Sequence, residues 1–524
     1  MRRTCVVILL ALLSLGIAWV VLGRSTAAPA ITGPLTRLDR PPCITPDYRE
    51  VVIPPNIAPL HFRLAEQIND WSAEIWGEQN VRRTLHGKGT DVRIPTSFWR
   101  SLLDSSAGGT IRLAFSGRHE DGGWIAFEPF EIRVAREPVD PYLAYRIIDP
   151  VFGCWGHMSI RQRDLTSFAE TAILRNRTFA YDCSNCHTFH AHDPSRLALQ
   201  IRSQDVGACM VVADGGQTTR VYTATEFNRS AAAYSRWHPN GRAIAFAAIK
   251  VMQFFHAIGH TRDVFDEASD LAVYLVDENL VTTTPAISDP DWLETYPEWS
   301  PDGSYLYFCR APQKPVEEFR TVKYDLMRIA YNARTNTWGE LETILSSADT
   351  QLSVTHPRVS PDGRYLLFTM CEYGNFSIYR PDSDLHLLDL TTGKYVKLPI
   401  NSDRADSYHS WSTNGRWIVF SSKRRDGLFT HPYLSYFDEQ GNAHRPFILP
   451  QQDPGFYESY LKVFNVPEFV TGPVRVSPNL LTRTITEPDF RQQAELDPQV
   501  TARDAGTPRD MPWHSVREVP GNPR

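Results

Sequence analysis

The stretch TYPEWSPDGSYLYF, residues 295–308, contains the pattern that decides the fold. Its Trp-Ser-Pro-Asp-Gly core recurs with substitutions, so that four copies begin at Trp237, Trp299, Val359 and Trp411. The glycines of successive copies are separated by 62, 60 and 52 residues. In every copy an aliphatic residue stands three positions after the glycine and a phenylalanine stands five positions after it. Both positions face the same side of a strand, so each copy presents the same apolar pair to a neighbour.

A repeat of this length with a hairpin turn in each copy is typical of a β-propeller blade. Asp-Gly and Asn-Gly supply the positive φ angles that a tight hairpin needs. We therefore predict a mainly β protein with a propeller over residues 205–482. The tryptophans of the repeats and the phenylalanines that follow them are predicted to form the core between blades.

These repeats resemble the TolB/Tricorn type of propeller, over roughly residues 205–475. The resemblance implies five to seven blades, with six favoured. The run Val476-Ser-Pro-Asn479 looks like the start of a further, degenerate copy.

The region before the propeller has a different strand pattern. Ile111, Leu113 and Phe115 alternate with polar or small residues, as do Phe130, Ile132 and Val134. This alternation predicts an antiparallel β-sandwich over residues 51–145. The Pro-rich residues 29–50 are predicted to be a linker, and the polar, aperiodic residues 483–524 a disordered tail.

The N-terminus has the form of an export signal. Arg2 and Arg3 precede an uninterrupted apolar run, residues 5–23, which ends at small residues. Residues 1–28 are thus predicted to be a signal peptide or an N-terminal anchor, with possible membrane anchorage through residues 5–23. Either case puts the rest of the chain in the periplasm or another extracytoplasmic space. The net charge of -6 gives no reason to expect a nucleic-acid partner.

The eight cysteines are too few for a disulfide scaffold, but two of them form a C-x-x-C-H sequence, Cys183-Ser-Asn-Cys186-His187. Two thiols at this spacing can each add to one vinyl group of haem, and the adjacent imidazole can then reach the iron. We predict one covalent haem c, held by Cys183 and Cys186 with His187 as proximal axial ligand, in a haem-binding segment over residues 146–204. A thiol-disulfide pair and half of a zinc site are the alternatives; no βαβ pattern or second cysteine pair accompanies either.

The sixth position of the iron is left open by the sequence. Met158 and His157 are the nearby candidates for a distal ligand, and an open position is the third. Histidines from the propeller are further candidates. They are His256, His260, His356 and His409.

The whole arrangement also resembles a group of exported bacterial proteins in which a sandwich and a C-x-x-C-H segment precede TolB-like blades. Runs such as IPPNIAPLHFRL (53–64) and FNVPEFV (464–470) carry this likeness. A more distant similarity is to the α subunit of hydrazine synthase, which joins a c-type haem domain to a propeller but carries a second haem. This chain has one C-x-x-C-H, a departure that keeps that enzyme's activity out of the prediction.

Two functional hypotheses follow. The first is a monohaem c-type cytochrome that transfers electrons to a redox partner protein, or acts as a haem-dependent oxidoreductase on a small-molecule substrate. The second is a TolB-like scaffold for protein-protein interaction, with a structural or sensory haem.

Overall fold

The computed structural model describes most of residues 35–500. The parts of this stretch that lie outside the description are residues 120–121, 151–154, 180–182, 204, 229–231 and 254–262. The predicted signal or anchor (1–28) also falls outside the described residues, as does the chain from residue 501 onward. Within the described ranges no helix combines the length and the apolar character that a membrane span requires.

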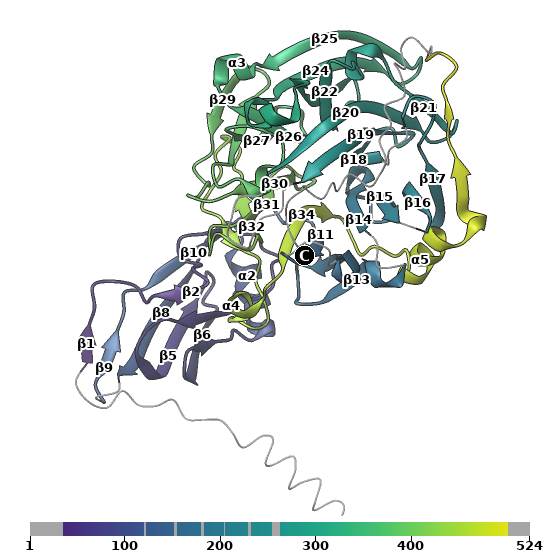
Figure 1. Ribbon diagram of the computed structural model, residues 1–524. Helices are drawn as coiled ribbons and strands as arrows, with labels where there is room; N and C mark the ends of the chain where they lie inside the picture. The colour runs from purple at the N-terminus through teal and green to yellow at the C-terminus, as the bar shows by residue number, and fades with distance from the viewer. Residues whose placement is uncertain are drawn as a thin grey trace, which may run out of the picture.

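The N-terminal domain consists of two sheets and one helix, at the lower left of Figure 1. The larger sheet contains β1 (Leu35–Arg37), β3 (Val52–Ile53), β5 (Ile68–Trp76), β6 (Arg82–Lys88), β8 (Thr110–His119), β9 (Trp124–Ala126) and β10 (Phe130–Val134). The smaller sheet contains β2 (Ile44–Thr45), β4 (Phe62–Leu64) and β7 (Asp91–Val92). The predicted alternation is confirmed, because every second residue of β8 from Ile111 to Gly117 and of β10 from Phe130 to Val134 is buried. The sequence analysis missed helix α2 (Thr96–Ser106), whose Trp99 and Leu102 are fully buried.

Most of the rest of the described chain forms six sheets, each built around four antiparallel strands, which we number as blades 1 to 6. Blade 1 contains β14 (Cys183–Phe189), β15 (Arg196–Ser203), β16 (Gly207–Asp214) and β17 (Gln217–Tyr222); blade 2 contains β18 (Ala232–Trp237), β19 (Ala243–Gln253), β20 (Val264–Leu275) and β21 (Leu280–Thr282). Blade 3 contains β22 (Trp292–Trp299), β23 (Tyr305–Pro312), β24 (Asp325–Asn332) and β25 (Thr337–Leu345); blade 4 contains β26 (Ser353–Val359), β27 (Tyr365–Cys371), β28 (Asp384–Asp389) and β29 (Lys394–Lys397). Blade 5 contains β30 (Asp406–Trp411), β31 (Trp417–Ser422), β32 (His431–Tyr436) and β33 (Phe447–Ile448); blade 6 contains β34 (Val463–Val470), β11 (Tyr142–Ile148), β12 (Ser159–Asp164) and β13 (Glu170–Arg175).

The first strand of each blade contacts the first strand of the next, which closes the blades into a ring. The contacts run from β14 to β18, β22, β26, β30 and β34, and β34 contacts β14 again. Blade 6 combines distant parts of the chain, because β34 pairs antiparallel with β11. The molecule is therefore a β-propeller (Figure 1). Its ring is closed in blade 6, where the C-terminal strand β34 forms one sheet with β11, β12 and β13 from the start of the propeller.

The repeated glycine lies in the turn between the first and second strands of its blade. In blade 3 the Gly303 N–H donates to the Ser300 carbonyl at 2.8 Å, and Gly303 has φ +74°. Among the turn residues only the glycine has positive φ, so the turn is a type I turn followed by a left-handed glycine rather than the tight two-residue hairpin turn. A Cβ at Gly303 would lie 2.4 Å from the ring of His238, which explains why glycine is needed here.

The predicted core between blades is confirmed. The aliphatic residue and the phenylalanine after each glycine have no exposed surface in any of the four blades. Trp299 packs with Leu306 and Phe308 of its own blade and with Ala245 and Ala247 of blade 2. Each repeat thus fills the space between two neighbouring sheets.

Two stretches differ from the predicted domain organisation. Residues 146–204, expected to form a separate haem-binding segment between sandwich and propeller, instead supply strands of blades 6 and 1, so the ring begins at Tyr142. Residues 483–500, expected to belong to a disordered tail, instead contain the end of a helix and two short strands.

The run Val476–Asn479 does not start another blade. Ser477 accepts a hydrogen bond from the Leu480 N–H and caps helix α5 (Pro478–Thr486). After α5, β35 (Arg491–Gln493) pairs with β17 and β36 (Glu495–Leu496) pairs with β21. These short strands cover the outer edges of blades 1 and 2.

Candidate functional site

Every inner strand of the propeller contains an irregular position that points its residue toward the axis. The pairing register shifts there in all six blades. The residues with positive φ at these bulges are Cys186 (49°), Tyr234 (51°), Tyr296 (52°), His356 (55°), Tyr408 (48°) and Val466 (48°). Left-handed backbone is uncommon for residues other than glycine, and bulges of this kind re-aim side chains next to binding sites.

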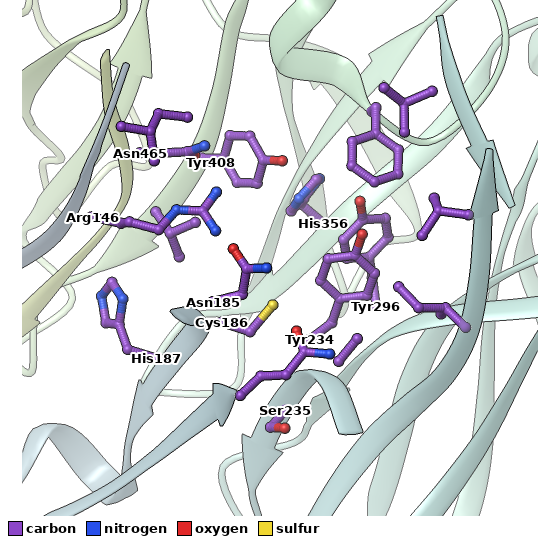
Figure 2. A pocket seen from close by; sticks show the side chains of 18 of the residues that line it. Arg146, Asn185, Cys186, His187, Tyr234, Ser235, Tyr296, His356, Tyr408 and Asn465 are labelled. Carbon is purple, nitrogen blue, oxygen red and sulfur yellow. The ribbon is translucent and has the colours of Figure 1, made fainter. Parts of the chain in front are cut away.

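These six residues, which we call the axial ring, all line one cavity at the centre of the propeller. Figure 2 shows Cys186 approaching it from one strand and Tyr296, His356 and Tyr408 from others. The cavity therefore contains a thiol, an imidazole and three phenols within a single ring of backbone positions.

The C-x-x-C-H sequence lies in β14, at the bulge of blade 1. Cys186 and His187 line the axial cavity. The Cys183 thiol is not part of the cavity wall but lies behind two residues that are. It accepts a hydrogen bond from Asn185 at 3.0 Å and lies 3.7 Å from the guanidinium of Arg202. Cys183 and Cys186 are both free thiols. The strand thus presents one thiol and the imidazole to the cavity directly.

His187 has an unusual environment for a buried histidine. Its side chain is 2% exposed, and neither ring nitrogen makes a hydrogen bond of acceptable geometry, although the backbone of Val466 lies beside the ring. Burial, together with the positive charges of Arg146 and Arg236, lowers the pKa of His187 to about 3. The ring is therefore neutral at physiological pH and keeps a lone pair that nothing in the described structure uses.

The two predicted distal candidates lie in different places. Met158, at 4% exposure, is a cavity residue, so the structure brings it together with Cys186 and His187. His157 faces away: its side chain is 66% exposed, and its Nδ1 lies 2.7 Å from Asp149. Of this pair, Met158 alone reaches the cavity.

The other histidines considered from the sequence differ in availability. His409 is buried, and its Nε2 lies 3.1 Å from the Leu367 carbonyl. His356 lines the cavity with an Nε2 that has no hydrogen-bond partner. His256 and His260 lie outside the described residues.

Positive charge dominates the cavity wall. Arg146 and Arg202 line it, and no carboxylate in the described part of the chain lies within ion-pair distance of either guanidinium. Arg236 and Arg358 also line it, but both pair with Glu298, at 3.1 and 3.3 Å. The carboxylate that also lines the cavity, Asp149, pairs with His157 and Lys462. Two guanidinium groups that have no carboxylate partner among the described residues make the cavity suited to a ligand that carries acidic groups.

The ion pairs to Glu298 separate the axial cavity from a second one. Arg236, Glu298, Arg358 and Glu468 all line this second cavity, which lies toward the Trp-Ser-Pro-Asp-Gly turns. We call these four residues the axial ion network. Arg236 bridges the network, because it lies 3.1 Å from Glu298 and 3.9 Å from Glu468.

Sequence reasoning missed most of the axial ring, although the repeat contains its signal. Tyr234, Tyr296, His356 and Tyr408 each stand three residues before the first position of their copy. When the four copies are aligned, this position holds three tyrosines and one histidine. An aromatic residue in every copy indicates that the position has the same structural role in each blade. The residues directly before the first three copies, Arg236, Glu298 and Arg358, similarly mark the axial ion network, whereas Ser410 precedes the fourth copy.

The other cysteines that the structure describes do not line the axial cavity, and they bear on the alternative of a zinc site. Cys209, Cys309 and Cys371 are all buried. Cys43 is exposed, and Cys154 lies outside the described residues. Nowhere in the described ranges do three or more histidine, cysteine, aspartate or glutamate side chains gather as they would around a metal ion.

No protein-family model matches the chain, and no curated protein matches its sequence. Weak structural likenesses exist to solved proteins that contain propellers. A prolyl endopeptidase shares 13% identity at a TM-score of 0.34 over 52% of this chain, and hydrazine synthase from Kuenenia stuttgartiensis shares 11% at 0.40 over 61%. This chain spans 37% and 48% of those two proteins, respectively. The propeller domain of the trilobed protease from Pyrococcus furiosus shares 9% at 0.31, over 63% of this chain and 79% of that domain.

Proposed function

We propose that this protein is an exported monohaem c-type protein that carries out electron transfer or haem-based redox chemistry at the axis of its propeller. Cys183 and Cys186 would hold the haem through thioether links, and His187 would bind its iron. When bound, the haem supplies one-electron redox chemistry. Thioether attachment takes place outside the cytoplasm, which agrees with the export signal proposed for residues 1–28.

The observation that carries the proposal is the state of His187. A buried imidazole with two nitrogens that make no hydrogen bond is costly unless a ligand uses one of them. The neighbouring Cys186 is a free thiol on the same cavity. A disulfide between Cys183 and Cys186 would leave this histidine unexplained, whereas a haem would use all three side chains.

The charges of the cavity support the same ligand. Haem carries two acidic propionate groups, and Arg146 and Arg202 are the two cavity arginines that lack a carboxylate among the described residues. Together the side chains provide an axial ligand, thiols and compensating positive charge. The redox partner or small-molecule substrate, and anchorage through residues 5–23, belong to the same proposal.

Replacing both cysteines tests the proposal. The full chain is produced in a periplasm with a cytochrome c maturation system, and haem is followed on a denaturing gel and by intact mass. We expect the wild type to retain one haem through denaturation, the single variants Cys183→Ser and Cys186→Ser to retain it through one link, and the double variant to lose it. Cys43→Ser, at an exposed thiol, should leave the haem in place.

A wild-type chain that carries no covalent haem would contradict the proposal. If its mass were instead lower by two hydrogens, and the double variant lacked that loss, the pair would be a disulfide.

A further inference from the structure

We propose that His356 provides the second axial ligand of the haem, from the opposite wall of the cavity, in place of the sequence-adjacent Met158 or His157. This inference rests on the proposed haem at Cys183, Cys186 and His187. Its basis is the position of His356 in the ring, the state of its Nε2 and the contacts that fix its imidazole.

The order of the blades places His356 across the axis from the C-x-x-C-H sequence. Cys186 lies at the bulge of β14 in blade 1, and His356 lies at the equivalent bulge of β26 in blade 4. Because the six inner strands form a closed ring, two blades separate these bulges in either direction. A haem attached to blade 1 would have His187 on the side of that blade. The axial-ring residue on the opposite side of the haem would be His356 of blade 4.

The hydrogen bonds around His356 determine which nitrogen is free. The Thr355 hydroxyl donates to the Asn375 carbonyl at 3.1 Å, so its oxygen accepts from the His356 Nδ1–H at 2.5 Å. With the reverse assignment the Thr355 oxygen would face the Asn375 carbonyl as acceptor against acceptor. The proton therefore lies on Nδ1, and Nε2 carries the lone pair.

The free nitrogen is buried and has no partner. His356 is 3% exposed, and its Nε2 makes no hydrogen bond. A neutral imidazole fixed by a hydrogen bond on Nδ1 and open at Nε2 is the usual form of a histidine that binds a metal.

Two aromatic neighbours fix the plane of the ring. The centroid of Tyr296 lies 3.9 Å from that of His356, and the centroid of Tyr408 lies 4.4 Å away on another side (Figure 2). Tyr296 is itself anchored, because its hydroxyl donates to the same Asn375 carbonyl at 3.1 Å. The imidazole is thus held in one orientation before any ligand arrives.

His409 shows that this arrangement is specific to one position. It lies in blade 5, one residue after the axial ring, and is as buried as His356. Its Nε2 is taken up by the Leu367 carbonyl, and His409 is not a residue of the axial cavity wall. It therefore serves as a matched control: a buried propeller histidine whose removal disturbs packing but not the proposed ligand.

The test uses the full chain with its covalent haem and reads the spin state rather than activity. We expect the wild type to be low-spin and indifferent to added carbon monoxide. His356→Ala should become high-spin in the ferric state and bind carbon monoxide when reduced, and added imidazole should return it to low spin. His409→Gln should keep the wild-type spectrum.

A second measurement does not depend on the variant folding. Pulsed electron paramagnetic resonance of ¹⁵N-histidine-labelled wild type counts the imidazoles bound to the iron, and we expect two. One imidazole, a high-spin wild type, or a His356→Ala protein that stays low-spin would each overturn the assignment. Met158 would be the ligand if Met158→Leu alone became high-spin. Absence of haem from the denaturing gel would instead reject the proposed function itself, so the two failures are distinguishable.

Discussion

Tyr234, Tyr296, His356 and Tyr408 occupy the same structural position in four successive blades, each with left-handed backbone. Such backbone costs roughly 1 to 2 kcal/mol for a residue with a Cβ. The strands on both sides fix the bulge, so its conformation is kept despite this cost. Four aromatic side chains thereby reach the axis from positions where a regular strand would point them into a sheet interface.

Behind this aromatic wall lies a carboxylate that makes stability depend on pH. Asp266 is 5% exposed and accepts hydrogen bonds from Asn375 at 2.6 Å and Tyr324 at 3.4 Å. Burial nevertheless raises its pKa to about 7. The folded protein thus holds a proton that the unfolded chain has released above about pH 4. The resulting stabilisation is complete at low pH and is lost as pH rises through 7.

Asp266→Asn keeps the shape of the protonated acid and should remove this dependence. We expect the wild-type free energy of unfolding to fall between pH 5 and pH 8 by about 2 to 3 kcal/mol more than that of the variant. Urea titrations of both proteins at the two pH values provide the measurement. Other titrating groups are common to both proteins and cancel in the difference; equal pH dependence would show that Asp266 is ionised throughout.

At the scale of elements, helix α5 fills the seam where the ring closes. Leu481 and Ile485 are fully buried against Leu174 of blade 6 and Leu199 and Val211 of blade 1. This is the seam between the blade assembled from both halves of the chain and the blade that follows it. Residues that follow the last blade in sequence therefore help to hold the ring shut.

Truncating Leu481 should open a cavity in that seam. We expect Leu481→Ala to lower the free energy of unfolding by about 2 to 5 kcal/mol, as for other fully buried leucines. Leu461→Ala, at a leucine that is 64% exposed, should change it by less than about 0.5 kcal/mol. Chemical denaturation of the two variants compares them directly, and similar effects would mean that α5 contributes nothing to closure.

The elements that could be predicted from the sequence are those determined by residues close to one another along the chain. The turn at Gly303 and the pair Leu306 and Phe308 depend on residues close in sequence, so the repeat identifies blades 2 to 5. Blade 6 carries no turn motif, and the pairing of β34 with β11 joins residues some three hundred positions apart. Nothing local encodes that pairing.

The residues of the candidate site likewise fall into those that a local motif predicts and those that depend on how the blades are arranged. The C-x-x-C-H motif drew attention to Cys186 and His187, which the structure places on one cavity. His356 was one histidine among several, because its place opposite Cys186 follows from blade order rather than from spacing. The sequence also could not show that His157 turns away from the cavity while Met158, the next residue, faces it.

At the scale of the whole molecule, the sandwich and the propeller share one hydrophobic core. Trp71 and Phe115 of the sandwich belong to the same cluster as Trp417 and Leu434 of blade 5. The Trp417 Nε1–H also donates to the Glu137 carbonyl at 3.1 Å. A shared core of this kind couples the folding of the two domains.

We expect the chain to unfold in a single cooperative transition, observed by differential scanning calorimetry. Trp417→Ala should lower that transition as a whole, by about 3 to 5 kcal/mol in the free energy of unfolding. Two transitions in the wild type, of which the variant lowers only one, would show that the domains fold independently despite their contact.

The closing strand also imposes an order of events in time. The chain is synthesised from its N-terminus, so Cys183 and Cys186 emerge from the ribosome long before residues 463–470 of β34. Until that strand arrives, one of the six walls of the axial cavity is missing and the nascent ring stays open. The two thiols therefore stay accessible for an interval, roughly the time needed to make another 280 residues, before folding can enclose the site.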